Sequence, residues 1–269
     1  MKGRSEPELP LPPLQMRKLV GPVADEAFDN PTREPVYPYL DAAVFESVFD
    51  FGCGCGRVAR QLIQQCPRPE RYVGIDLHYG MIRWCQQNLA PRAPGFEFHH
   101  HDVFNYHFNP GPSKPRMLPF PVADDSATLV NAYSVFTHLT EDQALYYHHE
   151  VARVLEKRGV FNSTWFLFDK REFPALQEGS NALYISYVDP SAAVFFDRNW
   201  VKATARAAGL VVTRAIPPDI RGYQWTLVME PAREGIEEVE LPPDQAPLGT
   251  VQLHGVPDDP SRIGLNASG

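Results

Sequence analysis

The sequence predicts an α/β fold in which a doubly wound, mostly parallel sheet carries helices on both faces. Short apolar runs of strand length alternate with segments of helical periodicity over residues 48–229, which implies parallel strands joined by helical crossovers. A glycine-rich turn joins the first strand to the first helix, and an acidic residue ends the next strand. Because such sheets bind ligands at the carboxyl ends of their strands, the functional site is expected there.

The predicted elements follow one another from a short buried strand near residue 48. The helix after it ends before Cys66-Pro67, because the residue before a proline disfavours the helical conformation. Two later helices end near Gly159 and Gly209, since glycine commonly follows a helix end. Seven strands are predicted, the last two as a closing pair: Val48–Phe51, Arg71–Asp76, Phe96–His100, Thr128–Tyr133, Val160–Phe168, Leu210–Ile216 and Tyr223–Met229. Four helices lie between them: Val58–Gln65, Gly80–Leu89, Glu141–Leu155 and residues 199–208.

The chain divides into a folded domain and two flanking segments. Residues 1–22 are rich in proline and are interpreted as a flexible arm, while residues 231–269 form an acidic, proline-rich tail. Residues 23–230 form the domain. Within it, residues 169–199 are too many for an ordinary connection and include several aromatic side chains. We expect this segment to be a lid or pocket wall, the alternative being a subdomain packed for stability.

The amino-acid composition favours some classes of protein over others. With 43% hydrophobic and 22% charged residues, the chain of 269 residues is typical of a soluble globular protein. Its net charge of −8 argues against a nucleic-acid partner, whose phosphates attract basic surfaces. No run of about 18 apolar residues predicts a membrane span. Four cysteines and no apparent secretion signal favour a reducing, cytoplasmic setting. The oligomeric state is not predicted.

The stretch FDFGCGCGR at residues 49–57 raises a choice between a cysteine site and a glycine loop. Glycine has no Cβ, so the backbone turns sharply and a ligand can lie against it at the start of a helix. Cys53 and Cys55 supply only two thiolates, whereas a structural zinc site needs about four ligands. The cysteines are therefore interpreted as small side chains filling a tight loop, and no metal site is predicted. The run His99–His101 does not change this, because neighbouring strand residues point to opposite faces.

Asp76 ends the strand that follows the glycine loop, about 20 residues on, where an acid can bind ribose hydroxyls. Together these residues resemble the class I S-adenosylmethionine-dependent methyltransferases, in particular the type 11/12-like group. The motifs that carry the resemblance are Asp50-x-Gly52-x-Gly54-x-Gly56, Gly74-Ile75-Asp76-Leu77, Met81-Ile82, His101-Asp102-Val103, Leu118-Pro119-Phe120-Pro121 and Arg153–Gly159. The likeness covers roughly residues 45–230. It departs at Arg158, where many relatives have a second glycine, and at Ala127–Leu129, where many have an acid.

The resemblance implies a Rossmann-like sheet of seven mostly parallel strands, with the last strand antiparallel, and S-adenosyl-L-methionine as cofactor. The three glycines of the loop would line its methionine moiety. Asp50 would orient the loop or meet the ammonium group, and Asp76 would bind both ribose hydroxyls. The adenine would be held by the remaining three expected contacts: Leu77, Asp102 and the backbone of Val103.

Methyl transfer to a hydroxyl also requires a base beyond the fourth strand, and His138 is the candidate because its ordinary pKa lies near neutrality. The alternative for this histidine is packing or capping. The expected function is methyl transfer to a small-molecule acceptor with an apolar or aromatic part, at oxygen rather than nitrogen or carbon. Three alternatives remain: a protein or RNA methyltransferase, a non-catalytic cofactor-binding module, and a nicotinamide-dependent oxidoreductase, which the glycine spacing disfavours.

Overall fold

The computed structural model describes residues 9–173, 179–186, 188–218 and 224–241. The helices are α1 (Leu14–Val20), α2 (Arg57–Gln64), α3 (Tyr79–Asn88), α4 (Glu141–Val154) and α5 (Arg198–Ala207). The strands are β1 (Ser47–Phe51), β2 (Arg71–Asp76), β3 (Phe96–His100), β4 (Ala127–Ala132), β5 (Leu155–Phe168), β6 (Ala182–Tyr184), β7 (Val194–Asp197), β8 (Leu210–Ile216) and β9 (Gln224–Pro231).

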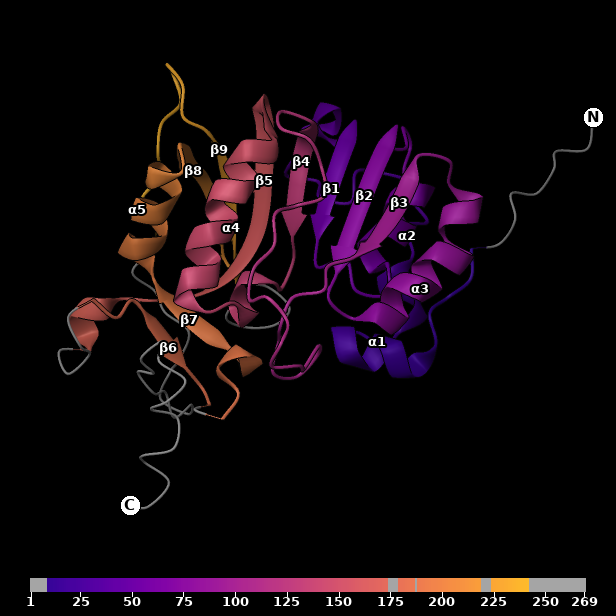
Figure 1. Cartoon of the computed structure of the whole chain (residues 1–269). Helices are drawn as coiled ribbons and strands as arrows, with labels where there is room; N and C mark the ends of the chain where they lie inside the picture. The colour runs from indigo at the N-terminus through magenta and orange to yellow at the C-terminus, as the bar shows by residue number, and fades with distance from the viewer. Residues whose placement is uncertain (1–8, 174–178, 187, 219–223, 242–269) are drawn as a thin grey trace, which may run out of the picture.

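The strands form a single sheet whose main part confirms the predicted topology (Figure 1). Strands β3, β2, β1, β4 and β5 lie side by side in that order and are parallel. Strand β9 pairs antiparallel with β5 along Phe161–Phe166, and β8 pairs antiparallel with β9 on its other side. These seven strands are the expected mostly parallel sheet, with the last strand of the chain running against its neighbours.

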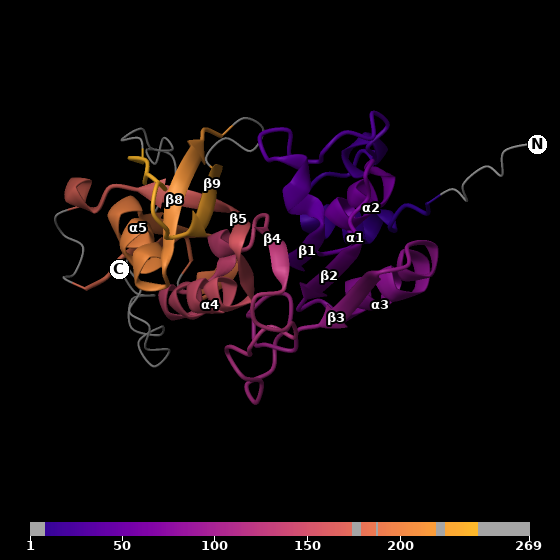
Figure 2. The same ribbon diagram turned by 90° about the horizontal axis from the view of Figure 1, so that it is seen from above.

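Helices lie on both faces of the sheet (Figure 2). The side chains of the strands alternate between the two faces. Phe49 of β1 packs in a cluster with α4 and α5, whereas its neighbour Val48 packs in a second cluster with α2 and α3. Val130 and Leu129 of β4 divide in the same way. This alternation follows from the strand period of two residues and gives the helices on each side an apolar surface.

The predicted insertion at residues 169–199 extends the sheet rather than only connecting elements. Strand β5 begins at Leu155, five residues before the predicted start, and its last three residues pair parallel with β7. Strand β6 then pairs antiparallel with β7. A short 3-10 helix, Pro190–Ala192, lies between these two strands. Whether the segment acts as a lid stays a prediction.

The N-terminal segment differs from the expected flexible arm, because Leu14–Val20 forms helix α1. Met16 and Val20 of this helix pack near buried Phe28, Cys55 and Met81, so tertiary contacts order a segment whose prolines suggested disorder. In Figure 1, α1 lies beyond the carboxyl ends of β1 and β2.

Arg60 of α2 holds the same N-terminal segment from inside the domain. Its buried guanidinium donates to the main-chain oxygens of Phe28 (2.8 Å) and Leu9 (2.9 Å) and pairs with Asp29. The chain before β1 is therefore fixed against α2 by a buried cation.

The acidic segment after β9 also contacts the domain in its described part. Glu238 pairs with Lys202 (3.2 Å) and with Arg206, both on α5, and the Val239 N–H donates to the Val212 carbonyl (2.8 Å). Residues beyond 241 of the predicted tail lie outside the described residues. Within the described ranges, no helix is both long and apolar enough to cross a lipid bilayer.

Candidate functional site

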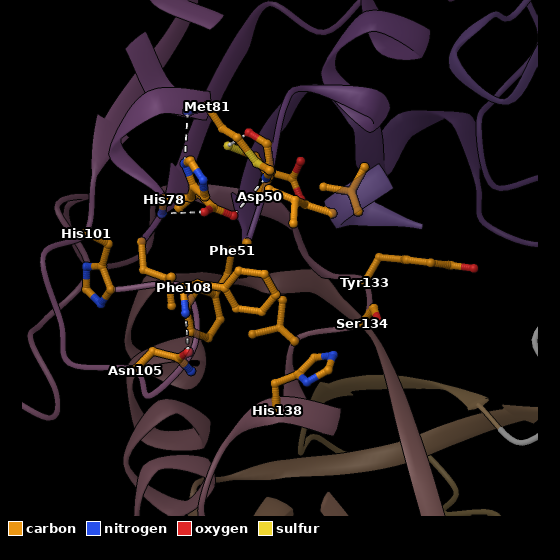
Figure 3. Close-up of a pocket in the computed structure, with 18 of the residues that line it drawn as sticks. Asp50, Phe51, His78, Met81, His101, Asn105, Phe108, Tyr133, Ser134 and His138 are labelled. Atoms are coloured by element: carbon orange, nitrogen blue, oxygen red, sulfur yellow. Dashed lines mark hydrogen bonds between the residues drawn. The ribbon is translucent and has the colours of Figure 1, made fainter. Parts of the chain in front are cut away.

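A cavity of about 460 Å³ opens at the carboxyl ends of β1, β2 and β4 (Figure 3). One wall is the end of α1 with Gly21, and a second is the glycine loop after β1. The loops after β3 and β4 close the other sides, together with Gln143 and Tyr147 of α4. The site therefore lies where the topology of the sheet predicts it.

The glycine loop has a backbone that side chains disfavour, as the sequence predicts. Gly52, Gly54 and Gly56 all have positive φ, at +81°, +55° and +78°. A Cβ at Gly52 would lie 2.3 Å from Val135 Cγ2, and one at Gly54 would lie 2.7 Å from Val20 Cγ1. Both glycines line the cavity.

Gly56 has a different place from the one expected. It is absent from the cavity wall, and a Cβ there would meet Leu89 Cδ1 at 2.5 Å, at the contact between α2 and α3. Its left-handed backbone starts α2, so the third glycine serves the turn and helix packing rather than the ligand surface.

The side chains of Cys53 and Cys55 are buried in the loop. Cys55 is completely buried, and burial raises the pKa of its thiol to about 12. Cys53 is 6% exposed, and burial raises its pKa well above the usual value. Both thiols therefore stay protonated, and thiolates are the form that binds metals. Among the described residues, no group of three or more His, Cys, Asp and Glu side chains is placed to hold a metal ion.

Asp50 is a buried carboxyl at the start of the loop. Its oxygens accept from the Tyr72 hydroxyl (2.6 Å) and the Asn131 amide (2.7 Å). Asn131 in turn accepts from Asn162 (3.1 Å), whose own oxygen accepts from the Tyr39 hydroxyl (3.1 Å). Burial raises the pKa of Asp50 to about 6 despite these donors. Since Asp50 lines the cavity, its remaining acceptor capacity faces a ligand.

Asp76 is also at the cavity, at the end of β2. Its oxygens accept from the backbone N–H groups of Gly54 (2.9 Å) and His78 (2.7 Å), so the acid holds the glycine loop and the start of α3 together. Burial raises its pKa. An ionised carboxylate has about four acceptor positions, so two remain for ligand hydroxyls.

Of the three residues expected around adenine, two line the cavity and one does not. Leu77 and Val103 are in the wall. Asp102 lies outside it, with a side chain that is 53% exposed and accepts from Lys114 (2.6 Å) and Asn109 (2.9 Å). Both donors lie later in the same loop and occupy the same carboxylate oxygen, Oδ1. The structure thus places Asp102 outside the cavity wall, and its contact with the adenine stays a prediction.

His138 lines the cavity across from the glycine loop, on the short 3-10 helix Phe136–His138 (Figure 3). Its Nδ1 lies 2.8 Å from the carbonyl oxygen of Ser191 in the insertion. A carbonyl only accepts, so Nδ1 carries a proton, and the neutral form of the ring has its lone pair on Nε2. Phe108 meets the imidazole edge-on, with ring centroids 6.5 Å apart.

Several cavity residues were not predicted from the sequence. Helix α1 contributes Lys18, Leu19 and Val20, and β4 is followed by Tyr133 and Ser134. Ser134 has φ +60°, and its hydroxyl accepts from Gln224 (3.1 Å). Arg57 directly follows the recognised glycine motif, so its position next to the motif could have been used as a signal.

His101 is a further unpredicted residue of the wall. Its Nε2 lies 2.8 Å from the hydroxyl of Tyr147, and burial lowers its pKa to about 4. The ring is therefore neutral near pH 7, and the three neighbouring histidines of this strand end do not form one site.

Comparison with known proteins identifies the domain around this cavity. Residues 48–159 match the family model of a methyltransferase domain. Among similar solved structures is a protein from Pyrococcus horikoshii OT3, with 18% identity over 69% of this chain and 82% of that one, at a TM-score of 0.46. Another is a TehB-like SAM-dependent methyltransferase from Corynebacterium glutamicum, with 16% identity, 70% and 80% coverage, and a TM-score of 0.44.

A third similar structure is the 1,6-didemethyltoxoflavin-N1-methyltransferase of Burkholderia thailandensis with bound S-adenosylhomocysteine. It has 16% identity over 70% of this chain and 71% of that one, at a TM-score of 0.48. Other similar structures are longer proteins, of which this chain covers about half, from 46% to 57%.

The residues of the cavity fit S-adenosylmethionine. Gly52 and Gly54 bring the loop backbone into the cavity wall, and Asp76 keeps acceptor positions for hydroxyls. Asp50 offers an acceptor for an ammonium group, and Leu77 and Val103 give an apolar wall. The family match confirms the predicted cofactor and the predicted class of enzyme. Residues 48–159 thus match a methyltransferase domain, and this match supports the resemblance to the class I S-adenosylmethionine-dependent methyltransferases.

Proposed function

We propose that this protein transfers the methyl group of S-adenosylmethionine to an oxygen atom of a small-molecule acceptor that has an apolar or aromatic part. The cofactor supplies a methyl group on a positively charged sulfur. The observation that carries the proposal is the placement of His138 in the same cavity as the glycine loop, with Nδ1 committed to the Ser191 carbonyl.

That placement supports a hydroxyl acceptor because a hydroxyl must lose its proton as it gains a methyl group. Nε2 of the neutral His138 ring accepts the proton from the acceptor O–H, and the oxygen keeps the electron pair that forms the new bond to carbon. A base held by hydrogen bonding in one tautomer is prepared for this role without rearrangement.

The apolar part of the acceptor is supported by the side chains near His138. Phe108, Val135 and Leu139 line this region of the cavity, and Tyr133 adds an aromatic face. Such a wall favours a ring or hydrocarbon over a strongly polar chain, with the few polar groups fixing its orientation.

The test is to incubate the protein with S-adenosylmethionine labelled in its methyl group and an extract of the host cell, and to separate the products by size. Label in small molecules supports the proposal and yields a compound for identification. Label on protein or RNA contradicts it and moves the acceptor to a macromolecule. If the cofactor binds and no extract accepts label, two explanations are left: an acceptor absent from the extract, or a non-catalytic binding module.

A further inference from the structure

Arg57 is a cationic residue in the wall of the cavity. It is the first residue of α2 and directly follows the glycine loop. Within the described ranges, no carboxylate oxygen lies within 4 Å of its guanidinium group, whereas Arg60, one turn later, pairs with Asp29. A charged side chain at a cavity without an ion-pair partner is available to a ligand of opposite charge.

The guanidinium of Arg57 is positioned by stacking. Its central carbon lies 4.6 Å from the centroid of the Tyr133 ring, and Tyr133 lines the same cavity. Contact with an aromatic face holds a guanidinium plane in place without using its N–H groups. The N–H groups at the edge of that plane are then available to a planar anion.

Asp50, an acid of the same wall, does not form an ion pair with Arg57. Asp50 is close enough for the arginine to lower its pKa electrostatically, yet the carboxylate accepts from Tyr72 and Asn131 rather than from Arg57. A cation and an anion that line one cavity without contacting each other leave room for a ligand group between them.

We propose that Arg57 binds a carboxylate group of the ligand in this cavity, through two N–H groups on its two oxygens. A guanidinium matches a carboxylate in shape and charge, and such paired hydrogen bonds are stronger than neutral ones. The proposal rests on the methyltransferase function proposed above. The carboxylate has two possible sources, which are the amino-acid end of the cofactor and an acidic group on the methyl acceptor.

The first measurement separates the cofactor from its nucleoside part. S-Adenosylhomocysteine carries the amino-acid end, and 5′-methylthioadenosine has the same nucleoside thioether without it. Calorimetric titration of both compounds is carried out on the wild type, Arg57→Met and Arg57→Lys. Arg83→Met is the matched control, because Arg83 stacks on Tyr79 (5.9 Å) away from the cavity wall. Circular dichroism checks that every variant is folded.

We expect Arg57→Met to weaken S-adenosylhomocysteine binding by about 10- to 100-fold, the usual loss for a charge-assisted pair at a partly exposed site. Binding of 5′-methylthioadenosine should stay within about twofold, and Arg57→Lys should retain part of the affinity. Arg83→Met should match the wild type. Equal losses for both compounds would show that Arg57 shapes the site instead of binding a carboxylate, and would overturn the proposal.

The second measurement addresses the acceptor. Protein saturated with S-adenosylhomocysteine is titrated with 2-hydroxybenzoate and with the neutral 2-hydroxybenzamide. If Arg57→Met leaves cofactor binding intact but abolishes a preference for the acid over the amide, the carboxylate belongs to the acceptor. If neither cofactor binding nor acid binding depends on Arg57, the proposal is wrong. A wild type that does not bind S-adenosylhomocysteine would instead contradict the cofactor assignment itself.

Discussion

His138 donates from Nδ1 to the main-chain carbonyl of Ser191 over 2.8 Å, which ties the segment after β4 to the insertion containing β6 and β7. Ser191 is only 5% exposed and lies on a 3-10 helix whose first residues are held by the Asp189 carboxylate (3.1 Å to the Ser191 N–H). The insertion therefore sets which ring nitrogen of the candidate base carries the proton.

The first prediction concerns His138 itself. Replacement by glutamine keeps a polar side chain but removes the base, so methyl transfer should slow by about 10²- to 10⁴-fold, while binding of S-adenosylhomocysteine should stay unchanged. Label transfer to the small-molecule fraction and calorimetry measure the two effects. His149→Gln, an exposed position on α4, is the control. Unchanged transfer in His138→Gln would remove this residue as the base.

Asp76 and Asp102 should differ in their effect on cofactor affinity. Asp76→Ala removes an acid of the cavity wall that also holds the Gly54 N–H, so S-adenosylhomocysteine should bind at least about tenfold more weakly. Asp102→Ala removes only an exposed partner of Lys114, so affinity should stay within about twofold. Calorimetry on both variants decides the matter, and a strong loss in Asp102→Ala would restore this acid to the adenine site.

Cofactor affinity should depend on pH through Asp50. Burial raises the pKa of Asp50 to about 6, so the carboxyl is ionised at pH 7 and largely protonated at pH 5. A ligand ammonium group prefers the ionised form. Binding of S-adenosylhomocysteine should therefore weaken by about tenfold between pH 7 and pH 5.

The control for that pH effect is Asp50→Asn, which should bind more weakly at pH 7 and lose this dependence. The compound 5′-methylthioadenosine lacks the ammonium group, so its profile accounts for other titrating groups such as Asp76. An identical pH slope in Asp50→Asn and the wild type would show that another group titrates.

Acid should destabilise the fold through His148, a buried residue of α4. Its ring stacks on Trp165, with centroids 5.4 Å apart, and burial lowers its pKa from 6.5 to about 3. Between these values the unfolded chain binds the proton and the folded one does not. Stability from this group is therefore complete above about pH 6.5 and falls as the pH drops, by about 2 kcal/mol at pH 5.

Replacing His148 by phenylalanine keeps an aromatic ring beside Trp165 and removes the titrating group. Urea unfolding at pH 7.5 and pH 5 should show a smaller loss of stability in His148→Phe than in the wild type. His101 titrates in the same direction, with a pKa near 4, but it is present in both proteins and cancels in the comparison. A difference between the two proteins that is the same at both pH values would contradict the assignment.

The main strands and the glycine loop could be predicted because the patterns that mark them lie within short stretches of the sequence. The bounds of β2, β3 and β8 agree with the predicted strands, since a glycine or an acidic residue marks one end of each. Gly52, Gly54 and Asp76 could be placed because a strand end followed by glycines fixes the course of the backbone.

The features that the sequence did not predict depend on contacts between residues that are far apart in the chain. The side-chain direction of Asp102 is decided by Lys114 and Asn109, and a position after a strand does not reveal such partners. Helix α1 depends on packing against Phe28 and Met81, and the composition of this proline-rich stretch does not reveal such contacts. Ser191 lies 53 residues from His138 in the chain, so the sequence could not predict which ring nitrogen of the candidate base carries the proton.

The cavity needs more of the chain than the range by which the family is recognised, because helix α1 lies outside residues 48–159. A protein trimmed to residues 48–159 would keep every glycine and acid by which the family is detected. It would lose the wall formed by residues 18–21 and leave the guanidinium of Arg60 without the carbonyl oxygens of Leu9 and Phe28. Transplanting this methyltransferase activity onto another chain would thus mean moving the stretch that precedes the first strand together with the motif.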